Sequence, residues 1–68
     1  MDRKILINVS LPGWVKWRAQ DADGMWYGYD YPPAIYEDTM VWDKLDSEEV
    51  FLCKGVPTKN WRKTLKRV

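Results

Sequence analysis

Hydrophobic and polar positions alternate most clearly over two neighbouring stretches of the chain, residues 14–20 and 25–31. Both stretches are rich in Trp, Tyr and Val, which favour strands. Between them, residues 21–24 read Asp-Ala-Asp-Gly, and an Asp-Gly pair supplies the residues that tolerate positive φ in tight hairpin turns. The pattern therefore predicts an antiparallel β-hairpin over residues 14–31.

Alternation assigns the side chains of each hairpin strand to two faces. In the first strand Lys16 and Arg18 mark the outward face together with Trp14 and Gln20. The opposite face is predicted to turn inward and consists of Val15, Trp17 and Ala19. In the second strand, Gly28 is expected to let a neighbouring ring lie flat against the backbone.

Three further short strands are predicted outside the hairpin. Residues 4–9 alternate in part, with three β-branched residues on one face. Prolines at positions 32 and 33 end the hairpin because they cannot donate to a strand ladder, and residues 34–39 are expected to form a loop. Apolar runs typical of short strands follow, separated by a polar turn, at residues 39–42 and 50–54.

The C-terminal residues 61–68 are predicted to form a short helix. Trp61, Leu65 and Val68 recur at i, i+4 and i+7 on one stripe, and Asn60 or Thr58 suits the N-cap. Such a short helix must dock through its apolar stripe. The predicted fold class is α+β, a small antiparallel β-sheet of four or five short strands with the C-terminal helix packed on it. An all-β mini-barrel is the alternative.

Composition limits both the fold and the chemistry. A chain of 68 residues suits a single domain, residues 1–68, and five Trp can bury on the order of 1,000 Å² without a disulfide or a metal. The chain has no His and one Cys, which excludes His-based triads, His metal ligands and an internal disulfide. Cys53 is expected to be a small buried hydrophobe, and one reduced thiol suits a cytoplasm.

No acidic pattern indicates catalysis or metal binding. Asp21, Asp23 and Gly24 match the start of a calcium loop, but the later ligands of that loop are missing, so turn formation accounts for them. The remaining acids in the middle of the chain read as solvated loops. The sequence therefore predicts a protein that is not an enzyme and needs no metal and no cofactor, and no apolar run is long enough for a membrane span.

Charge is unevenly distributed along the chain. Residues 1–55 hold six basic and ten acidic residues, whereas residues 56–68 hold five basic residues and no acid. This distribution disfavours an acidic mimic of DNA. A nucleic-acid-binding function would use the basic C-terminal residues Lys59, Arg62, Lys63, Lys66 and Arg67. The same residues are equally suited to a solvated surface or to pairing with the acidic segment 43–49.

Aromatic residues exceed what most small cores use. Of the five Trp we expect three or four to be buried and one or two to be exposed. Trp, Tyr and Arg anchor many protein interfaces. The candidates for contact with a partner protein are Trp14, Arg18, Trp26, Tyr27, Tyr29 and Tyr31, with Arg62 or Lys63 at the rim.

Two spaced motifs carry a resemblance to a known group of proteins. They read Trp14-x-x-Trp17-Arg18-Ala19-x-Asp21-x-Asp23-Gly24-x-Trp26-Tyr27-x-Tyr29, with Pro32-Pro33 and Trp42 after it, and Asn60-Trp61-Arg62-Lys63-Thr64-Leu65. This pattern resembles a group of small accessory proteins of tailed bacteriophages. The group usually has an acidic residue where this chain has Lys63. The resemblance implies an accessory protein that works in the cytoplasm of the infected bacterium, where such proteins often bind a host protein.

Three functions remain open from the sequence. The leading hypothesis is a non-enzymatic protein-binding module that inhibits a host bacterial protein by occupying its surface. The alternatives are a small nucleic-acid-binding protein that uses the basic C-terminal residues and exposed aromatics, and a small structural or homo-oligomeric phage component.

Overall fold

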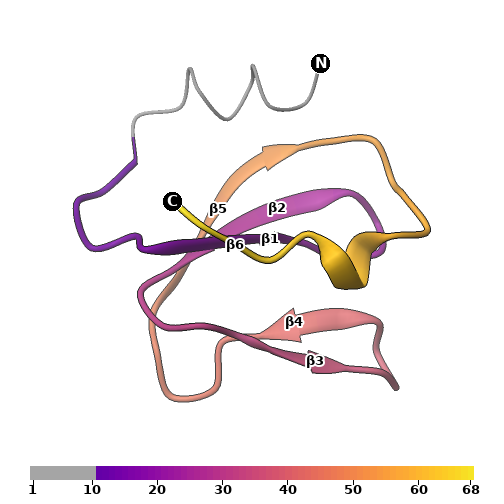
Figure 1. Cartoon of the computed structure of the whole chain (residues 1–68), viewed down its shortest axis with the longest axis horizontal. Helices are drawn as coiled ribbons and strands as arrows, with labels where there is room; N and C mark the ends of the chain where they lie inside the picture. Colours follow the sequence, from indigo (N-terminus) through magenta and orange to yellow (C-terminus); the bar gives the residue numbers. More distant parts are fainter. Residues whose placement is uncertain (1–10) are drawn as a thin grey trace.

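The computed structural model describes residues 11–68, and the strand predicted over residues 4–9 lies outside them. Its strands are all paired antiparallel. The elements in chain order (Figure 1) are β1 Trp17–Gln20, β2 Met25–Tyr29, β3 Ala34–Tyr36, β4 Val41–Asp43, β5 Glu49–Lys54, the 3₁₀ turn η1 Trp61–Lys63 and β6 Lys66–Arg67. The small antiparallel sheet is therefore confirmed, with almost no helix.

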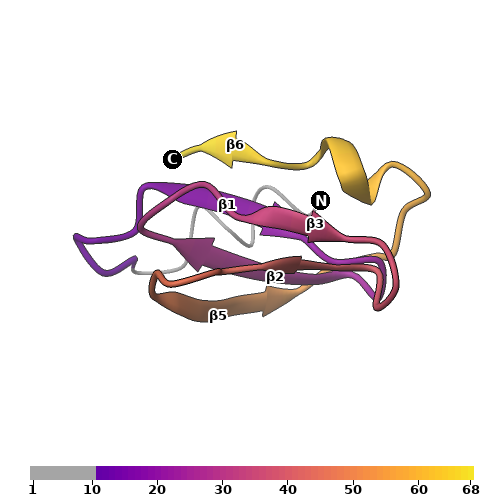
Figure 2. The ribbon, with the colours of Figure 1, turned by 90° about the horizontal axis from the view of Figure 1, so that it is seen from below.

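The strands form two layers. A four-stranded sheet has the order β5-β2-β1-β6, and the two-stranded ribbon β3-β4 lies against one of its faces (Figures 1 and 2). Between the layers lies a cluster of buried side chains, Ala19, Tyr29, Trp42 and Trp61. The larger sheet stays open, with β5 and β6 at its edges, so residues 11–68 form no closed barrel.

The hairpin prediction is confirmed by β1 and β2, although both strands are shorter than the alternation indicated. Trp17 pairs with Tyr29, and Gln20 pairs with Trp26. In the turn, the Gly24 N–H donates to the Asp21 carbonyl at 2.9 Å, and Gly24 has a φ of 97°. This left-handed conformation is the one that glycine tolerates best.

Val15 lies on the face opposite to the predicted one. The Lys16 N–H donates to the Tyr29 carbonyl at 2.8 Å, and Trp17 also lies opposite Tyr29, so two residues of one strand face one of the other. This β-bulge reverses the alternation before Trp17. Val15 consequently covers Gly28, where an added Cβ would lie 2.8 Å from Val15 Cγ1. The neighbour that requires a glycine at this position is therefore a valine, and not the aromatic ring that the sequence predicted.

The predicted C-terminal helix is wrong. Within residues 61–68 helical geometry is confined to η1, and β6 then pairs with the outer edge of β1. Backbone N–H and C=O groups at a sheet edge need partners, and β6 supplies them to β1. Packing of the short apolar stripe stabilises a helix less than the pairing with β1 stabilises a strand. Trp61 and Leu65 nevertheless pack into the core, as the stripe predicted.

The loop predicted over residues 34–39 is also wrong in its first half, which forms β3. Ile35 pairs with Trp42, and Tyr36 pairs with Val41. The burial of Trp42 between the layers stabilises this ribbon, and strand propensity depends strongly on such packing. The strand predicted at residues 39–42 is present as β4 with shifted bounds, and the one at 50–54 is present as β5.

Buried hydrogen bonds of Gln20 and Trp42 connect segments that are far apart in the sequence. Gln20 was expected on the outward face, but it is only 2% exposed. Its Nε2 donates to the carbonyls of Gly24 at 3.0 Å and Val56 at 2.9 Å. The indole N–H of Trp42 donates to the Gln20 carbonyl at 3.0 Å, and the Trp42 backbone N–H donates to Asp21 Oδ1 at 2.8 Å. A single buried amide therefore connects the hairpin turn with the segment that follows β5.

Tyr29 gives a first stability prediction. Its side chain is 0% exposed, its hydroxyl has no hydrogen-bond partner in the described part of the chain, and burial raises the pKa of Tyr29 far above its usual value. A buried hydroxyl without a partner destabilises the folded state. We expect Tyr29→Phe to raise the free energy of unfolding by about 1 kcal/mol. Urea denaturation, with the half-buried Tyr27→Phe as control, measures this, and a loss of stability would contradict it.

Candidate protein-binding surface

Four of the predicted contact residues have structural roles in the sheet. Trp26 and Tyr29 are buried. Arg18 is half-buried with its guanidinium 4.9 Å from the Trp26 ring centroid, and burial lowers the pKa of Arg18. Tyr27 is half-buried and meets the exposed Phe51 edge-to-face, with ring centroids 5.6 Å apart. The structure therefore does not present these four as one contact surface.

Trp14 and Tyr31 are the predicted contact residues that the structure leaves exposed. Both lie just beyond the pair formed by Trp17 and Tyr29, and hence at the same end of the hairpin. Tyr31 is 70% exposed. The expected numbers of buried and exposed tryptophans also hold. Trp26, Trp42 and Trp61 are buried, Trp17 is half-buried, and Trp14 is exposed.

A shallow hollow of about 400 Å³ opens beside Tyr31. We call it the Leu45 hollow, and its lining consists of Asp30, Tyr31, Lys44, Leu45, Asp46 and Ser47. Leu45 is 52% exposed, so a large apolar side chain stands next to the exposed ring of Tyr31. The loop between β4 and β5 thus adds an apolar contact to the end of the hairpin.

Leu45 occupies an unfavourable backbone conformation. It is the second residue of a four-residue turn, closed by a 3.0 Å hydrogen bond from the Ser47 N–H to the Lys44 carbonyl, and its φ is 59°. A left-handed conformation costs a non-glycine residue about 1–2 kcal/mol. Gly, Asn and Asp dominate such turn positions. A leucine at this position strains the backbone while leaving half of its side chain in water.

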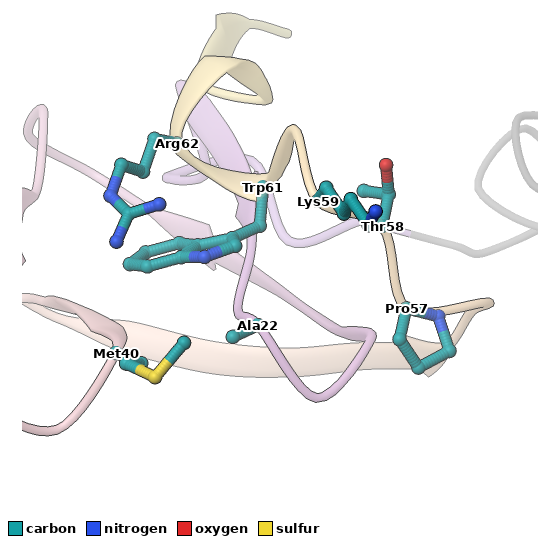
Figure 3. Close-up of a pocket in the computed structure, with 7 residues that line it drawn as sticks. All are labelled: Ala22, Met40, Pro57, Thr58, Lys59, Trp61 and Arg62. Carbon is teal, nitrogen blue, oxygen red and sulfur yellow. The ribbon is translucent and has the colours of Figure 1, made fainter.

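A second hollow, of about 430 Å³, lies at the other end of the β3-β4 ribbon (Figure 3). We call it the Met40 hollow, and its lining consists of Ala22, Met40, Pro57, Thr58, Lys59, Trp61 and Arg62. Met40 is the last residue of the loop between β3 and β4. It is 47% exposed and has a φ of 56°. The same combination of left-handed backbone and exposed apolar side chain therefore recurs here.

Arg62 is held in a defined position at the edge of the Met40 hollow. Its guanidinium lies 4.5 Å from the Trp61 ring centroid, on the side of the ring away from Met40 and Ala22 (Figure 3). Arg62 Nη2 donates to Glu37 Oε1 at 2.8 Å, and Nε donates to both carboxylate oxygens. This hydrogen bonding lowers the pKa of Glu37 and raises that of Arg62. Both side chains remain open to solvent.

The basic C-terminal residues are distributed over η1, β6 and the loop before η1. Lys59 and Arg62 line the Met40 hollow. Lys63 ends η1 and is exposed. Lys66 and Arg67 form the edge strand β6, where charged side chains hinder pairing with another chain. The Arg67 guanidinium lies 5.6 Å from the Trp17 ring centroid, so two of the five cations already have aromatic partners.

Asp21 is the buried carboxylate of the described residues. Within residues 11–68 no group of three or more His, Cys, Asp or Glu side chains could hold a metal ion. Asp21 accepts the Trp42 N–H inside the fold, and burial raises the pKa of Asp21 despite that hydrogen bond. Burial is also the largest cause that raises the pKa of Glu49, and the negative charge of Asp21 raises it further.

These shifts predict the pH dependence of stability. The pKa values of Asp21 and Glu49 are higher in the folded than in the unfolded state, so folding is favoured as protons bind. The free energy of unfolding should therefore rise as pH falls from 7 through these folded pKa values, and level off near pH 4, around the unfolded values. Urea denaturation between pH 4 and 7 measures this. Asp21→Asn should flatten the profile, and a steady loss of stability over this range would contradict it.

The sequence does not single out Met40 and Leu45 as exposed apolar residues with a left-handed backbone. Leu45 lay inside the polar run 43–49, and Met40 was assigned to a strand. A usable signal existed, because a large apolar residue stood at a predicted turn where glycine, asparagine or aspartate is usual. The backbone conformation that makes this signal meaningful becomes visible only in the structure.

Comparison with protein-family models, with curated proteins and with solved structures finds no match for this chain. In the part of the chain that the structure describes, no helix has the length and apolar character needed to cross a membrane.

Proposed function

We propose that this protein is a non-enzymatic protein-binding module, and that its main contact surface is the Leu45 hollow together with Trp14. The observation that carries the proposal is the backbone of Leu45. A φ of 59° strains the turn, and the side chain that causes this strain is 52% exposed next to Tyr31. A residue that is unfavourable for folding and faces solvent is best explained by contact with another molecule.

The residue types at this end of the hairpin support a protein as the partner. Tyr and Trp are enriched in interface hot spots because they combine a large apolar area with a polar group. Trp14 and Tyr31 supply such side chains, and Lys44, Asp46 and Asp30 give the hollow a polar rim. The mixture of an apolar centre and a charged rim is typical of protein interfaces.

The resemblance of the paired Trp motifs to small phage proteins suggests the biological setting. We propose an accessory protein that acts in the cytoplasm of the host bacterium, where it would bind a host protein and block that protein's surface. Steric occupation of a surface needs no catalytic group.

The test compares affinity capture from bacterial lysate by the wild type, Leu45→Asn and Val56→Ser. Val56 is an exposed apolar residue that lines neither hollow, so its substitution is the matched control. We expect a host protein that the wild type and Val56→Ser retain, and that Leu45→Asn binds at least tenfold more weakly, which corresponds to about 1.4 kcal/mol. The same proteins captured equally by all three variants would contradict the proposal.

Two further measurements address the alternative functions. Nucleic-acid binding through Lys59, Lys63 and Lys66 would quench Trp fluorescence on titration with oligonucleotides, and the affinity would fall steeply with salt. A homo-oligomeric component would sediment above the mass of 8.1 kDa. Salt-dependent oligonucleotide binding that Leu45→Asn leaves unchanged, or a stable oligomer in the absence of a partner, would each replace the proposed function.

A further inference from the structure

We infer that the Met40 hollow receives an apolar side chain of a partner protein followed by a carboxylate, and that Glu37 occupies Arg62 in place of that carboxylate while the protein is free. This inference deepens the proposed function and depends on it in one respect, namely that the ligand is a segment of a protein. It concerns a different surface from the Leu45 hollow, so the two can be tested separately.

The apolar part of the ligand follows from the lining of the hollow. Met40, Ala22 and Pro57 line the hollow together with Trp61, and Met40 and Ala22 lie below the Trp61 ring in the view of Figure 3. Methionine adapts its shape to varied apolar partners because its side chain is unbranched. The left-handed backbone of Met40 holds this side chain half in solvent. Such a lining fits one apolar side chain of a partner.

The carboxylate follows from the charges around the hollow. Its lining contains two cations, Lys59 and Arg62, and no acidic residue. Arg62 is stacked on Trp61 and therefore held in one orientation, which suits the fixed fork that guanidinium presents to carboxylates. Lys59 and Arg62 both line the hollow, but the Arg62 guanidinium lies across the Trp61 ring from Met40 and Ala22 (Figure 3), so a carboxylate next to the apolar side chain must pass the edge of this ring to reach it.

Glu37, which is not part of the lining of the hollow, shows that Arg62 already binds a carboxylate. Its two oxygens accept three hydrogen bonds from Arg62, at 2.8, 3.1 and 3.2 Å. Glu37 belongs to the same loop as Met40, and both members of the ion pair are exposed, at 44% for the Arg62 side chain and 62% for that of Glu37. Exposed ion pairs contribute little to stability and exchange readily with other ions. A carboxylate from a partner can therefore take the place of Glu37.

The test is an NMR titration with a defined probe, the peptide acetyl-Gly-Phe-Asp-Gly-amide. Its matched control replaces Asp by Asn. Shifts of the Trp61 indole and Met40 methyl signals report binding, and the unchanged signal of buried Trp26 reports an intact fold. We expect the Asp peptide to bind the wild type at least fivefold more tightly than the Asn peptide, and Arg62→Gln to abolish that difference.

The decisive variant is Glu37→Gln. Removal of the internal carboxylate should strengthen binding of the Asp peptide about threefold to tenfold, which corresponds to about 0.7–1.4 kcal/mol. Glu48→Gln makes the same change of charge away from the ion pair of Arg62 and Glu37, and should leave the affinity nearly unchanged. Equal effects of the two substitutions, weaker binding by Glu37→Gln, equal binding of both peptides, or no shift at Trp61 would each overturn the inference.

The outcome also separates this inference from the proposed function. Leu45→Asn should leave peptide binding at the Met40 hollow intact. If Leu45→Asn abolishes capture of the host protein while the peptide fails to bind, the proposed function stands and the inference falls. If the peptide binds as expected but capture does not depend on Leu45, the inference stands and the Leu45 hollow is not the main contact surface.

Discussion

Replacement of Trp42 by alanine is expected to lower the free energy of unfolding by about 3–5 kcal/mol. Trp42 is buried between the two layers and meets Trp61 edge-to-face, with ring centroids 6.4 Å apart. Its indole N–H donates to the carbonyls of Gln20 and Trp61. The substitution therefore leaves a large cavity and two buried acceptors with fewer donors. Because small domains have a total stability of only about 5 kcal/mol, much of the protein should unfold.

Urea denaturation followed by circular dichroism measures this effect. Trp42→Phe keeps an aromatic ring but loses the indole donor, and should cost about 1–3 kcal/mol. Trp14→Ala is the control, since Trp14 is exposed and its removal should change stability by less than about 1 kcal/mol. If Trp42→Ala were no less stable than Trp14→Ala, the two layers would not depend on this residue.

Gln20→Leu is expected to lower the free energy of unfolding by about 1–3 kcal/mol, although leucine is the more hydrophobic residue. The Val56 carbonyl would lose the donor that Gln20 Nε2 supplies, and the Gly24 carbonyl would keep only the Gly55 N–H. A buried acceptor left without a partner costs about 1–3 kcal/mol. The loss should therefore exceed the gain from the added apolar surface.

A second variant distinguishes lost hydrogen bonds from altered packing at Gln20. Gln20→Glu keeps the shape but places acceptors opposite two carbonyls, so at neutral pH it should be at least as unstable as Gln20→Leu. Protonation of the introduced carboxyl restores one donor, and stability should recover in part towards pH 4. If Gln20→Leu were as stable as the wild type, the segment after β5 would not depend on this amide.

The hairpin and the packing of Trp61 and Leu65 could be predicted because local patterns determine them. The Asp-Gly turn and the dense strand formers leave residues 17–29 few alternatives. The C-terminal strand could not be predicted, because β6 forms through pairing with the open edge of β1, a contact between residues far apart in the sequence. A two-residue strand has no alternation of its own to reveal it.

The burial of Gln20 and the reversed face of Val15 escaped prediction for related reasons. A glutamine beside Arg18 looks like a surface residue, and its partners at Gly24 and Val56 are brought together only by the fold. The bulge before Trp17 shifts the alternation by one residue without any mark in the sequence. Contacts between separate segments of the chain therefore determine where the side chains of Gln20 and Val15 lie.

For the candidate site, the sequence indicated exposed aromatics at the hairpin and the structure places Trp14 and Tyr31 there. Trp26 and Tyr29 belong to the interior instead, because both faces of the sheet are used for packing around the hairpin. The contribution of the loops could not be predicted, since the strain at Leu45 and Met40 is a property of the backbone.

The claim that Leu45 and Met40 serve contact and not folding is tested most directly by the stability of the double variant Met40→Asn/Leu45→Asn. Asparagine tolerates the left-handed conformation, so the relief of about 1–2 kcal/mol of strain at each position should offset the loss of a half-exposed apolar side chain. Urea denaturation should therefore give a free energy of unfolding within about 1 kcal/mol of the wild-type value. A loss of about 3 kcal/mol or more, as expected for buried core residues, would contradict the claim.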